Sequence, residues 1–109
     1  FIMKFIETSI FTKKLTQLLS DDEYRQLQNE LAINPLAGAL IQGTGGLRKI
    51  RWSRPGMGKR GGIRTIYYFL NETETIYMLL AYPKNEKDNL SDKEKKILRE
   101  LVKGFKNDF

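Results

Sequence analysis

Apolar and polar positions alternate along the chain in two different periods, which divides it into short strands and amphipathic helices. Residues 1–7 combine apolar, β-tolerant side chains with no preceding helix cap, so we expect a first strand there. Thr8 or Ser9 can cap a helix that runs to about Leu19, because apolar residues recur at helical spacing along this segment. The pattern therefore predicts a strand followed directly by a helix.

A second helix is bounded by clear signals at both ends. Ser20 and Glu23 have the spacing of a capping box, in which the serine oxygen accepts an orphan amide and the glutamate reaches back to the cap. Tyr24 and two leucines follow on one face. Asn34 and Pro35 end the helix, because proline lacks the amide that a continuing helix needs. We expect two antiparallel helices.

Three strands are predicted in the middle of the chain. The preceding segment, 35–46, is small, apolar and rich in glycine, which is typical of a surface loop. Residues 47–53, 63–70 and 75–82 then carry strand patterns, and the polar residues 71–74 suit a hairpin connection between the last two strands.

The final segment has the strongest helical pattern. Ser91 and Glu94 form a second capping box, and an apolar stripe follows it: Ile97, Leu98, Leu101, Val102 and Phe105. We interpret this stripe as core packing, with a groove for a partner's helix as the alternative. The order β-α-α-β-β-β-α predicts an α+β fold, with a mostly antiparallel four-stranded sheet, an N-terminal helical hairpin on one face and a C-terminal helix.

Length and composition narrow the class of protein. The 109 residues suit a single domain, 1–109. The chain has no cysteine and no histidine, so disulfides and thiolate chemistry are excluded, a zinc site would need carboxylates alone, and we expect neither metal nor cofactor. No apolar run approaches the roughly 20 residues that span a bilayer. We expect a cytoplasmic protein that does not insert into a membrane.

The net charge of +6 is concentrated in the middle of the chain. Seven basic residues and no acidic one lie between Arg48 and Arg64, interleaved with glycines. Such a run repels itself unless a polyanion neutralises it, and basic residues that meet phosphates also release counterions. Nucleic acid is the leading partner, an anionic membrane is the second, and a solvated loop is the alternative that needs no partner.

Side chains in a strand alternate between its two faces, which sorts the basic residues. Lys49 and Arg51 share one face of their strand. If the strands pair through the basic loop at 54–62, Arg64 joins them on the same surface of the sheet. Lys84, just past the last strand, can reach the rim of that surface. We therefore predict one cationic cluster from neighbouring strands.

Such a cluster can bind an RNA backbone, and it can also assist cleavage. Arginine and lysine stabilise the extra negative charge that develops when a ribose 2′-hydroxyl attacks the adjacent phosphate. A lysine among other cations can also act as a general base. Any RNA-binding sheet would present similar residues, so pure binding remains the alternative at this point.

Aromatic and further basic residues are candidates for RNA contacts. Tyr68 shares a face with Arg64 and is the better candidate for stacking on a base, whereas Trp52 and Tyr67 are expected in the core. The complete set of predicted RNA contacts is Arg48, Arg54, Lys59, Arg60, Tyr68, Tyr82 and, from the resemblance that follows, Asn85.

Three segments resemble the signature of HigB-type toxins in the RelE/ParE superfamily: GTGGLRKIRW at 43–52, GKRGGIRTIYYF at 58–69, and YPKNE at 82–86 followed by LS at 90–91. The resemblance implies a RelE-like fold and the toxin of a bacterial type II toxin-antitoxin pair. It further implies a ribosome-dependent endoribonuclease that cleaves messenger RNA in the ribosomal A site by 2′-hydroxyl attack and so inhibits translation. A cognate helix-turn-helix antitoxin, which also contacts operator DNA, would be its partner.

The resemblance also assigns roles. Lys49 and Arg51 correspond to the paired basic residues of the second strand, and Arg64 to the arginine of the third. Lys84 and Asn85 stand where the family keeps a basic or polar group. These positions make Lys49, Arg51, Arg64 and Lys84 the predicted catalytic residues.

One departure from the family affects the proton-transfer step. Some relatives place a tyrosine or histidine beyond the last strand, but residues 83–109 contain neither. The general base therefore stays open between Lys49 and Tyr82. Two further hypotheses also stay open: a superfamily member that poisons another target such as DNA gyrase, and a non-catalytic RNA-binding or ribosome-binding module. The basic cluster argues against the gyrase alternative, because gyrase-directed relatives tend to lack it.

Overall fold

The computed structural model describes residues 2–53, 62–87 and 89–107. Its main elements follow the predicted order, with one short strand added. They are β1 (Lys4–Glu7), α1 (Ser9–Leu18), α2 (Asp21–Ile33), β2 (Ala39–Leu40), β3 (Arg48–Trp52), β4 (Ile63–Leu70), β5 (Thr75–Pro83) and α3 (Asp92–Asn107).

The sheet has five strands in the order β1-β5-β4-β3-β2, where four were predicted. The additional strand, β2, lies in the segment expected to be a loop and pairs with β3 through two residues, Ala39 and Leu40. The pairing of β1 with β5 is parallel and the others are antiparallel. The prediction of a mostly antiparallel sheet is confirmed, and its strand count was too low by one edge strand.

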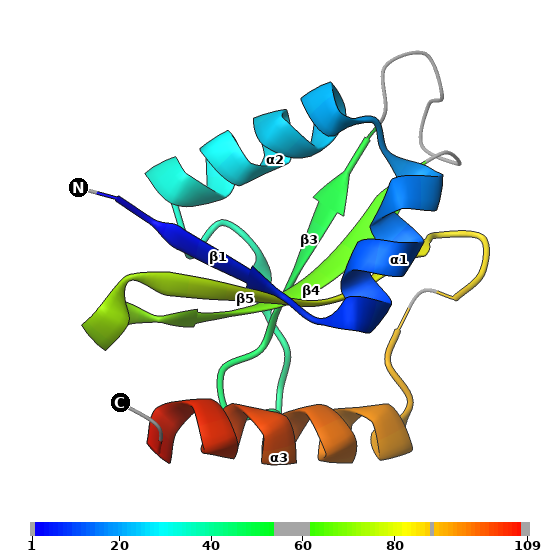
Figure 1. Ribbon diagram of the computed structural model, residues 1–109. Helices are drawn as coiled ribbons and strands as arrows, with labels where there is room; N and C mark the ends of the chain where they lie inside the picture. Colours follow the sequence, from blue (N-terminus) through cyan, green and yellow to red (C-terminus); the bar gives the residue numbers. More distant parts are fainter. Residues whose placement is uncertain (1, 54–61, 88, 108–109) are drawn as a thin grey trace.

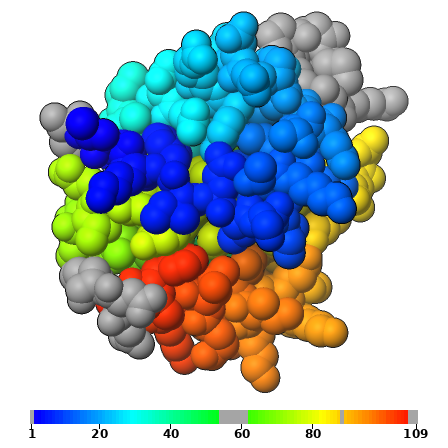
Figure 2. Space-filling model, in the orientation of Figure 1, coloured from blue at the N-terminus to red at the C-terminus, as the bar shows by residue number. Residues whose placement is uncertain are grey.

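Helices cover both faces of the sheet (Figure 1). The α1–α2 hairpin packs on one face, where Phe11 and Leu27 meet Tyr67 and Met78. On the other face lies α3. Because side chains of β4 point alternately into these two layers, seven of its eight residues are buried, all but Phe69. Figure 2 shows β1 and α1 in blue, and α3 in orange and red, on one side of the molecule.

The helix starts expected from the sequence are present. The Thr8 hydroxyl accepts a hydrogen bond from the Phe11 amide at 3.0 Å and caps α1. Ser20 forms a complete capping box at the start of α2. In front of α3, Ser91 and Glu94 exchange the two hydrogen bonds of the second capping box. These caps satisfy amides that the first turn of a helix leaves without partners.

The apolar stripe of α3 is only partly buried. The prediction of core packing is confirmed for Leu98 and Val102, which face the sheet. It was wrong for Ile97 and Leu101, which are 58% and 39% exposed. A period of 3.6 residues shows which side of the helix is apolar, but it does not show how much of that side the rest of the fold covers.

The glycine-rich turn at 43–46 has a structural role. The Thr44 hydroxyl donates to the Ile41 carbonyl at 2.6 Å and accepts from the Leu47 amide at 3.2 Å, which closes the turn into β3. Gly46 has a φ of 119°, and a Cβ there would lie 3.0 Å from the ring of Tyr68. Arg99 of α3 donates to the Gly43 carbonyl at 2.8 Å. The turn therefore helps to hold α3 on its face of the sheet.

Candidate functional site

The register of β3 and β4 brings the predicted cationic residues onto one face. Arg51 is the direct partner of Arg64, and Lys49 is the partner of Ile66. Ile66 packs in the cluster beneath α3, so all three cations lie on the α3 face of the sheet. Side chains at directly opposite antiparallel positions have Cβ atoms about 4.5–5.5 Å apart. The two arginines therefore start from adjacent positions.

The row continues onto a third strand. Arg64 is also the partner of Tyr82 on β5, so Arg51, Arg64 and Tyr82 lie side by side across three strands. Lys84 follows the end of β5, where its amide donates to the Gly62 carbonyl at 3.0 Å. Its side chain is exposed at the rim of the same end of the sheet.

The three cations differ in exposure. Arg51 is exposed, Lys49 is half-buried, and Arg64 is only 3% exposed. Like charges directly opposite each other repel, and a buried charge interacts more strongly than one in water. An anion between the two arginines would relieve the repulsion. The arrangement can thus bind a phosphodiester and stabilise additional negative charge on it.

Lys49 is tied to the segment that precedes α3. Its Nζ donates a hydrogen bond to Oδ1 of Asn89 at 3.0 Å, which joins residues 40 positions apart in the chain. The next residue, Leu90, is buried in the cluster beneath α3 and so anchors this segment. The contact directs the amine of Lys49 toward the β5–α3 connection.

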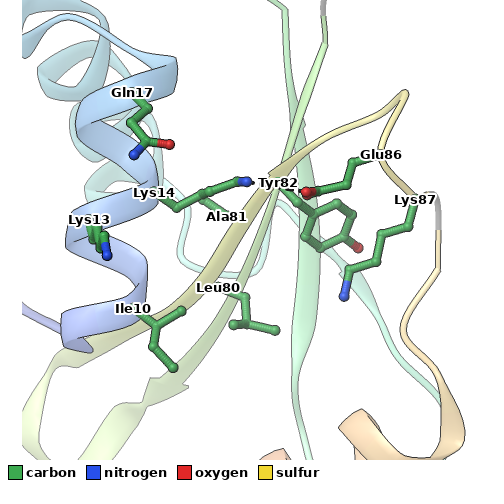
Figure 3. Close-up of a pocket in the computed structure, with 9 residues that line it drawn as sticks. All are labelled: Ile10, Lys13, Lys14, Gln17, Leu80, Ala81, Tyr82, Glu86 and Lys87. Atoms are coloured by element: carbon green, nitrogen blue, oxygen red, sulfur yellow. Dashed lines mark hydrogen bonds and ion pairs between the residues drawn. The ribbon is translucent and has the colours of Figure 1, made fainter.

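Tyr82 is covered rather than open to a base. Its side chain is 2% exposed, and the Nζ of Lys87 lies 5.0 Å from the centre of its ring (Figure 3). Lys87 also forms an ion pair with Glu94, and this hydrogen bond is the main reason that the pKa of the Glu94 carboxyl is lowered. The hydroxyl of Tyr82 is buried as well. The prediction that the Tyr82 ring contacts RNA directly does not fit this burial.

Tyr68 is a core residue, which corrects its assignment as a base-stacking surface. It does share the α3 face with Arg64, but it is 6% exposed and stacks with Phe105 of α3 at a centroid distance of 6.5 Å. Burial is the main cause of its raised pKa, followed by Glu72 and Tyr77. Strand alternation gave the correct face, but it did not show that α3 covers this end of it.

Arg48 lies on the opposite face and supports the fold there. Its guanidinium donates to the carbonyl oxygens of Gly38 at 2.7 Å and Leu36 at 3.4 Å. Its position away from Lys49 and Arg51 follows from strand alternation, and its assignment as an RNA contact stays a prediction. Trp52 and Tyr67 pack in the α1–α2 core, as the sequence predicted.

Of the remaining predicted RNA contacts, one lies at the rim of the site and three lie outside the described residues. Asn85 is exposed in the turn after β5, next to Lys84. Arg54, Lys59 and Arg60 lie outside the described residues.

No helix of the described residues is long and apolar enough to cross a bilayer.

Sequence reasoning missed three residues around this site: Lys14, Lys87 and Asn89. Lys87 and Asn89 follow β5 closely in sequence, and the polar segment after the last strand was the only available signal for them. Lys14 carried no signal, because its proximity to Tyr82 arises only when α1 packs beside β5.

Comparison with known proteins shows the family of this chain. The family model described as the RelE toxin of the RelE / RelB toxin-antitoxin system matches residues 3–108. Among solved structures, an arginine mutant of E. coli toxin RelE in the free state is similar, with a TM-score of 0.57 and 16% identity over 79% of this chain and 87% of that chain.

Two solved toxin-antitoxin complexes are also similar. The intact E. coli RelBE complex matches with a TM-score of 0.54 and 16% identity, over 75% of this chain and 96% of that chain. The archaeal RelE-RelB complex from Pyrococcus horikoshii OT3 matches with a TM-score of 0.52 and 22% identity, over 78% and 98%. At these identities the similarity concerns the fold, and the predicted RelE-like fold is confirmed.

Proposed function

This chain belongs to the family of RelE toxins of RelE / RelB toxin-antitoxin systems, and from that premise we propose that it is an endoribonuclease that cleaves messenger RNA on the ribosome. The observation that carries the proposal is the pairing of Arg51 with Arg64 on the α3 face, with Lys49 beside them. Three cations from neighbouring strands at one end of a sheet suit a scissile phosphate better than they suit a folded core.

The proposed reaction is an attack within the RNA strand. The ribose 2′-oxygen forms a bond to the adjacent phosphorus, the bond to the 5′-oxygen of the next nucleotide breaks, and a 2′,3′-cyclic phosphate results. Arg51 and Arg64 stabilise the additional negative charge on the phosphorane. A general base takes the 2′-hydroxyl proton, and a proton is delivered to the leaving 5′-oxygen.

Lys49 is the proposed general base. Its amine reaches the rim of the site and is held by Asn89, whereas the Tyr82 hydroxyl is buried. A base must lie within hydrogen-bond reach of the proton that it abstracts, and a lysine performs this step in its neutral form. Since this acid-base apparatus is modest, alignment of the message by the ribosome would supply much of the rate enhancement.

We also propose the subtype and the partner. The glycine-rich and basic segments at 43–52 and 58–69 support a HigB-type toxin. Two of the similar structures are complexes of RelE with RelB, which supports a cognate antitoxin that binds and restrains this chain. Operator DNA would then be contacted through a helix-turn-helix domain of that antitoxin.

The test is to express the protein with a reporter message and to map 5′ ends. We expect cuts within translated codons and none in a reporter without a start codon. Arg51→Ala should lower cleavage by about 10²-fold or more, because it removes one donor to the phosphorane. Arg25 on α2 is exposed. Arg25→Ala makes the same change in net charge as Arg51→Ala and should leave cleavage unchanged.

Other outcomes would contradict the proposal. Broken DNA with an SOS response and intact message would indicate the gyrase alternative. Intact message with unaffected growth would indicate a binding module without catalysis. Equal cleavage by Arg51→Ala and Arg25→Ala would remove Arg51 from the mechanism.

A further inference from the structure

A pocket lies where β1 leaves the edge of the sheet. β1 pairs only with residues 75–78 of β5, so beyond Met78 this edge of β5 faces α1. Between them is a pocket of about 400 Å³ that reaches the turn after β5 (Figure 3). In the space-filling view this turn, in yellow, borders α1 (Figure 2). Its volume is within the range of small-molecule sites, roughly 300–1,000 Å³.

The lining combines an apolar floor with a charged rim. Ile10 of α1 and Leu80 of β5 form the apolar part. Lys14 of α1 and Lys87 of the turn bring amines to the rim, where each forms an ion pair with a glutamate (Figure 3). A nucleotide has the complementary chemistry, since its base has two apolar faces and its phosphate is an anion.

The pocket is connected to the cationic row. Tyr82 lines the pocket and is also the direct strand partner of Arg64. A nucleotide in the pocket would therefore lie next to a phosphate held between Arg51 and Arg64. We propose that this pocket binds the message nucleotide adjacent to the scissile phosphate, an inference that rests on the proposed RNA cleavage.

An ion pair lies at the rim of the pocket. Lys14 and Glu86 approach to 3.2 Å and join α1 to the turn after β5, and their side chains are 34% and 49% exposed. Ion pairs at such exposure contribute little to stability, so replacing the Glu86 carboxylate by another anion costs little free energy. The RNA phosphate replaces the Glu86 carboxylate on Lys14. Glu86 is thus a competitor that the nucleotide must displace.

The opposite effects of the two partners provide the test. We would measure binding of a fluorescein-labelled single-stranded RNA hexamer with 2′-O-methyl riboses, which block 2′-attack, by anisotropy at several salt concentrations. Lys14→Ala should weaken binding about fivefold at low salt and reduce the salt slope by about 0.7, the value for one phosphate contact on a single strand. Glu86→Gln should tighten binding about twofold, because Lys14 is then free for the phosphate.

A matched control is available on α3. Lys103 forms an exposed ion pair with Glu100, so Lys103→Ala makes the same change in net charge as Lys14→Ala. Its salt slope should equal that of the wild type. If Lys14→Ala and Glu86→Gln both behave like Lys103→Ala, the pocket does not bind a nucleotide and the proposal is overturned. Since the two pocket variants should shift affinity in opposite directions, partial unfolding cannot imitate the expected result.

The source of the nucleotide is tested on programmed ribosomes. A message with 4-thiouridine next to the cleavage position should crosslink to residues 82–87 of the catalytically impaired Arg51→Ala variant. A crosslink from ribosomal RNA instead would overturn the placement beside the scissile phosphate. If the wild type fails to cleave translated message while the Lys14 and Glu86 effects persist, the nuclease proposal fails and an RNA-binding pocket remains. If the wild type cleaves translated message but the Lys14 and Glu86 variants show no effect, the pocket proposal fails and the nuclease proposal stands.

Discussion

Arg51 and Arg64 occupy paired positions, yet the protein surrounds them differently. Arg51 is exposed and can meet an incoming phosphate, whereas Arg64 is buried and fixed in place. A fixed guanidinium presents its donors in one plane, which suits two oxygens of the same phosphate. In the proposed mechanism, the exposed Arg51 would capture RNA and the buried Arg64 would orient it.

Lysine substitutions should separate these two roles. Arg64→Lys replaces a rigid planar fork by a point charge and should reduce cleavage by at least about tenfold, because the buried geometry is lost. Arg51→Lys keeps a charge on a flexible stem and should retain most of the activity. The measurement is the rate of cleavage of a translated reporter, with thermal unfolding to verify that both variants fold. Equal losses at the two positions would contradict this division.

The hydroxyl of Tyr67 has a structural role that stability measurements can check. It accepts a hydrogen bond from the Gly38 amide at 2.9 Å and donates one to the Pro35 carbonyl at 2.8 Å. Tyr67→Phe leaves these backbone groups without that partner and should lower the free energy of unfolding by about 1–3 kcal/mol.

Urea unfolding would measure this loss, with Tyr24→Phe as the control. The Tyr24 hydroxyl donates to Glu7 at 2.7 Å in an exposed contact, so its removal should cost less than about 1 kcal/mol. A larger loss at Tyr24 than at Tyr67 would show that the segment before β2 does not depend on this hydroxyl.

Two glycines in different elements should respond to alanine in opposite directions. Gly46 has a φ of 119° and lies against Tyr68, so Gly46→Ala should cost more than about 1 kcal/mol of stability. Gly104 lies in α3 with open space at its Cβ position, so Gly104→Ala should add about 0.5–1 kcal/mol. Thermal unfolding of both variants tests the prediction, and destabilisation by Gly104→Ala would contradict the assignment of that position to a regular helix.

The start of α3 should show a pH dependence through Glu94. Lys87 and the Ser91 amide lower the pKa of its carboxyl from the usual 4.5. The ionised form is favoured in the folded state, so its contribution to stability is complete above pH 4.5 and is lost as the pH falls through the lower folded value.

Glu94→Gln should therefore be less stable than the wild type at neutral pH, and the difference should shrink in acid. Lys87→Gln should reduce the acid sensitivity in the same way, since Lys87 is the largest cause of the shift. Unfolding by urea between about pH 7 and pH 3 measures this. A difference that stays constant over that range would show that the ion pair does not form in solution.

Individual elements were predictable where local chemistry specifies them. Capping boxes specify the starts of α2 and α3, and the proline after Asn34 specifies the end of α2. β2 was missed because its two exposed residues, Ala39 and Leu40, have no strand pattern and pair only through their backbones. Tyr68 was misassigned because alternation gives the face of a strand but not which helix covers it.

At the scale of the whole molecule, the shared face of Lys49, Arg51 and Arg64 followed from strand alternation and from pairing of consecutive strands. Lys14 and Asn89 could not be inferred in this way. Their positions depend on how α1 and the segment before α3 pack against the finished sheet, and a single sequence carries no direct signal for such contacts. The core of the candidate site was therefore predictable, and its surroundings were not.

The parallel pairing of β1 with β5 has a consequence for biosynthesis. Residues 4–7 are translated well before their partners at 75–78, so the sheet cannot close until β5 has been made. The face opposite the α1–α2 hairpin is then completed only when α3 docks. Under the proposed function, the ribosome that is still elongating this chain would not meet a completed copy of it.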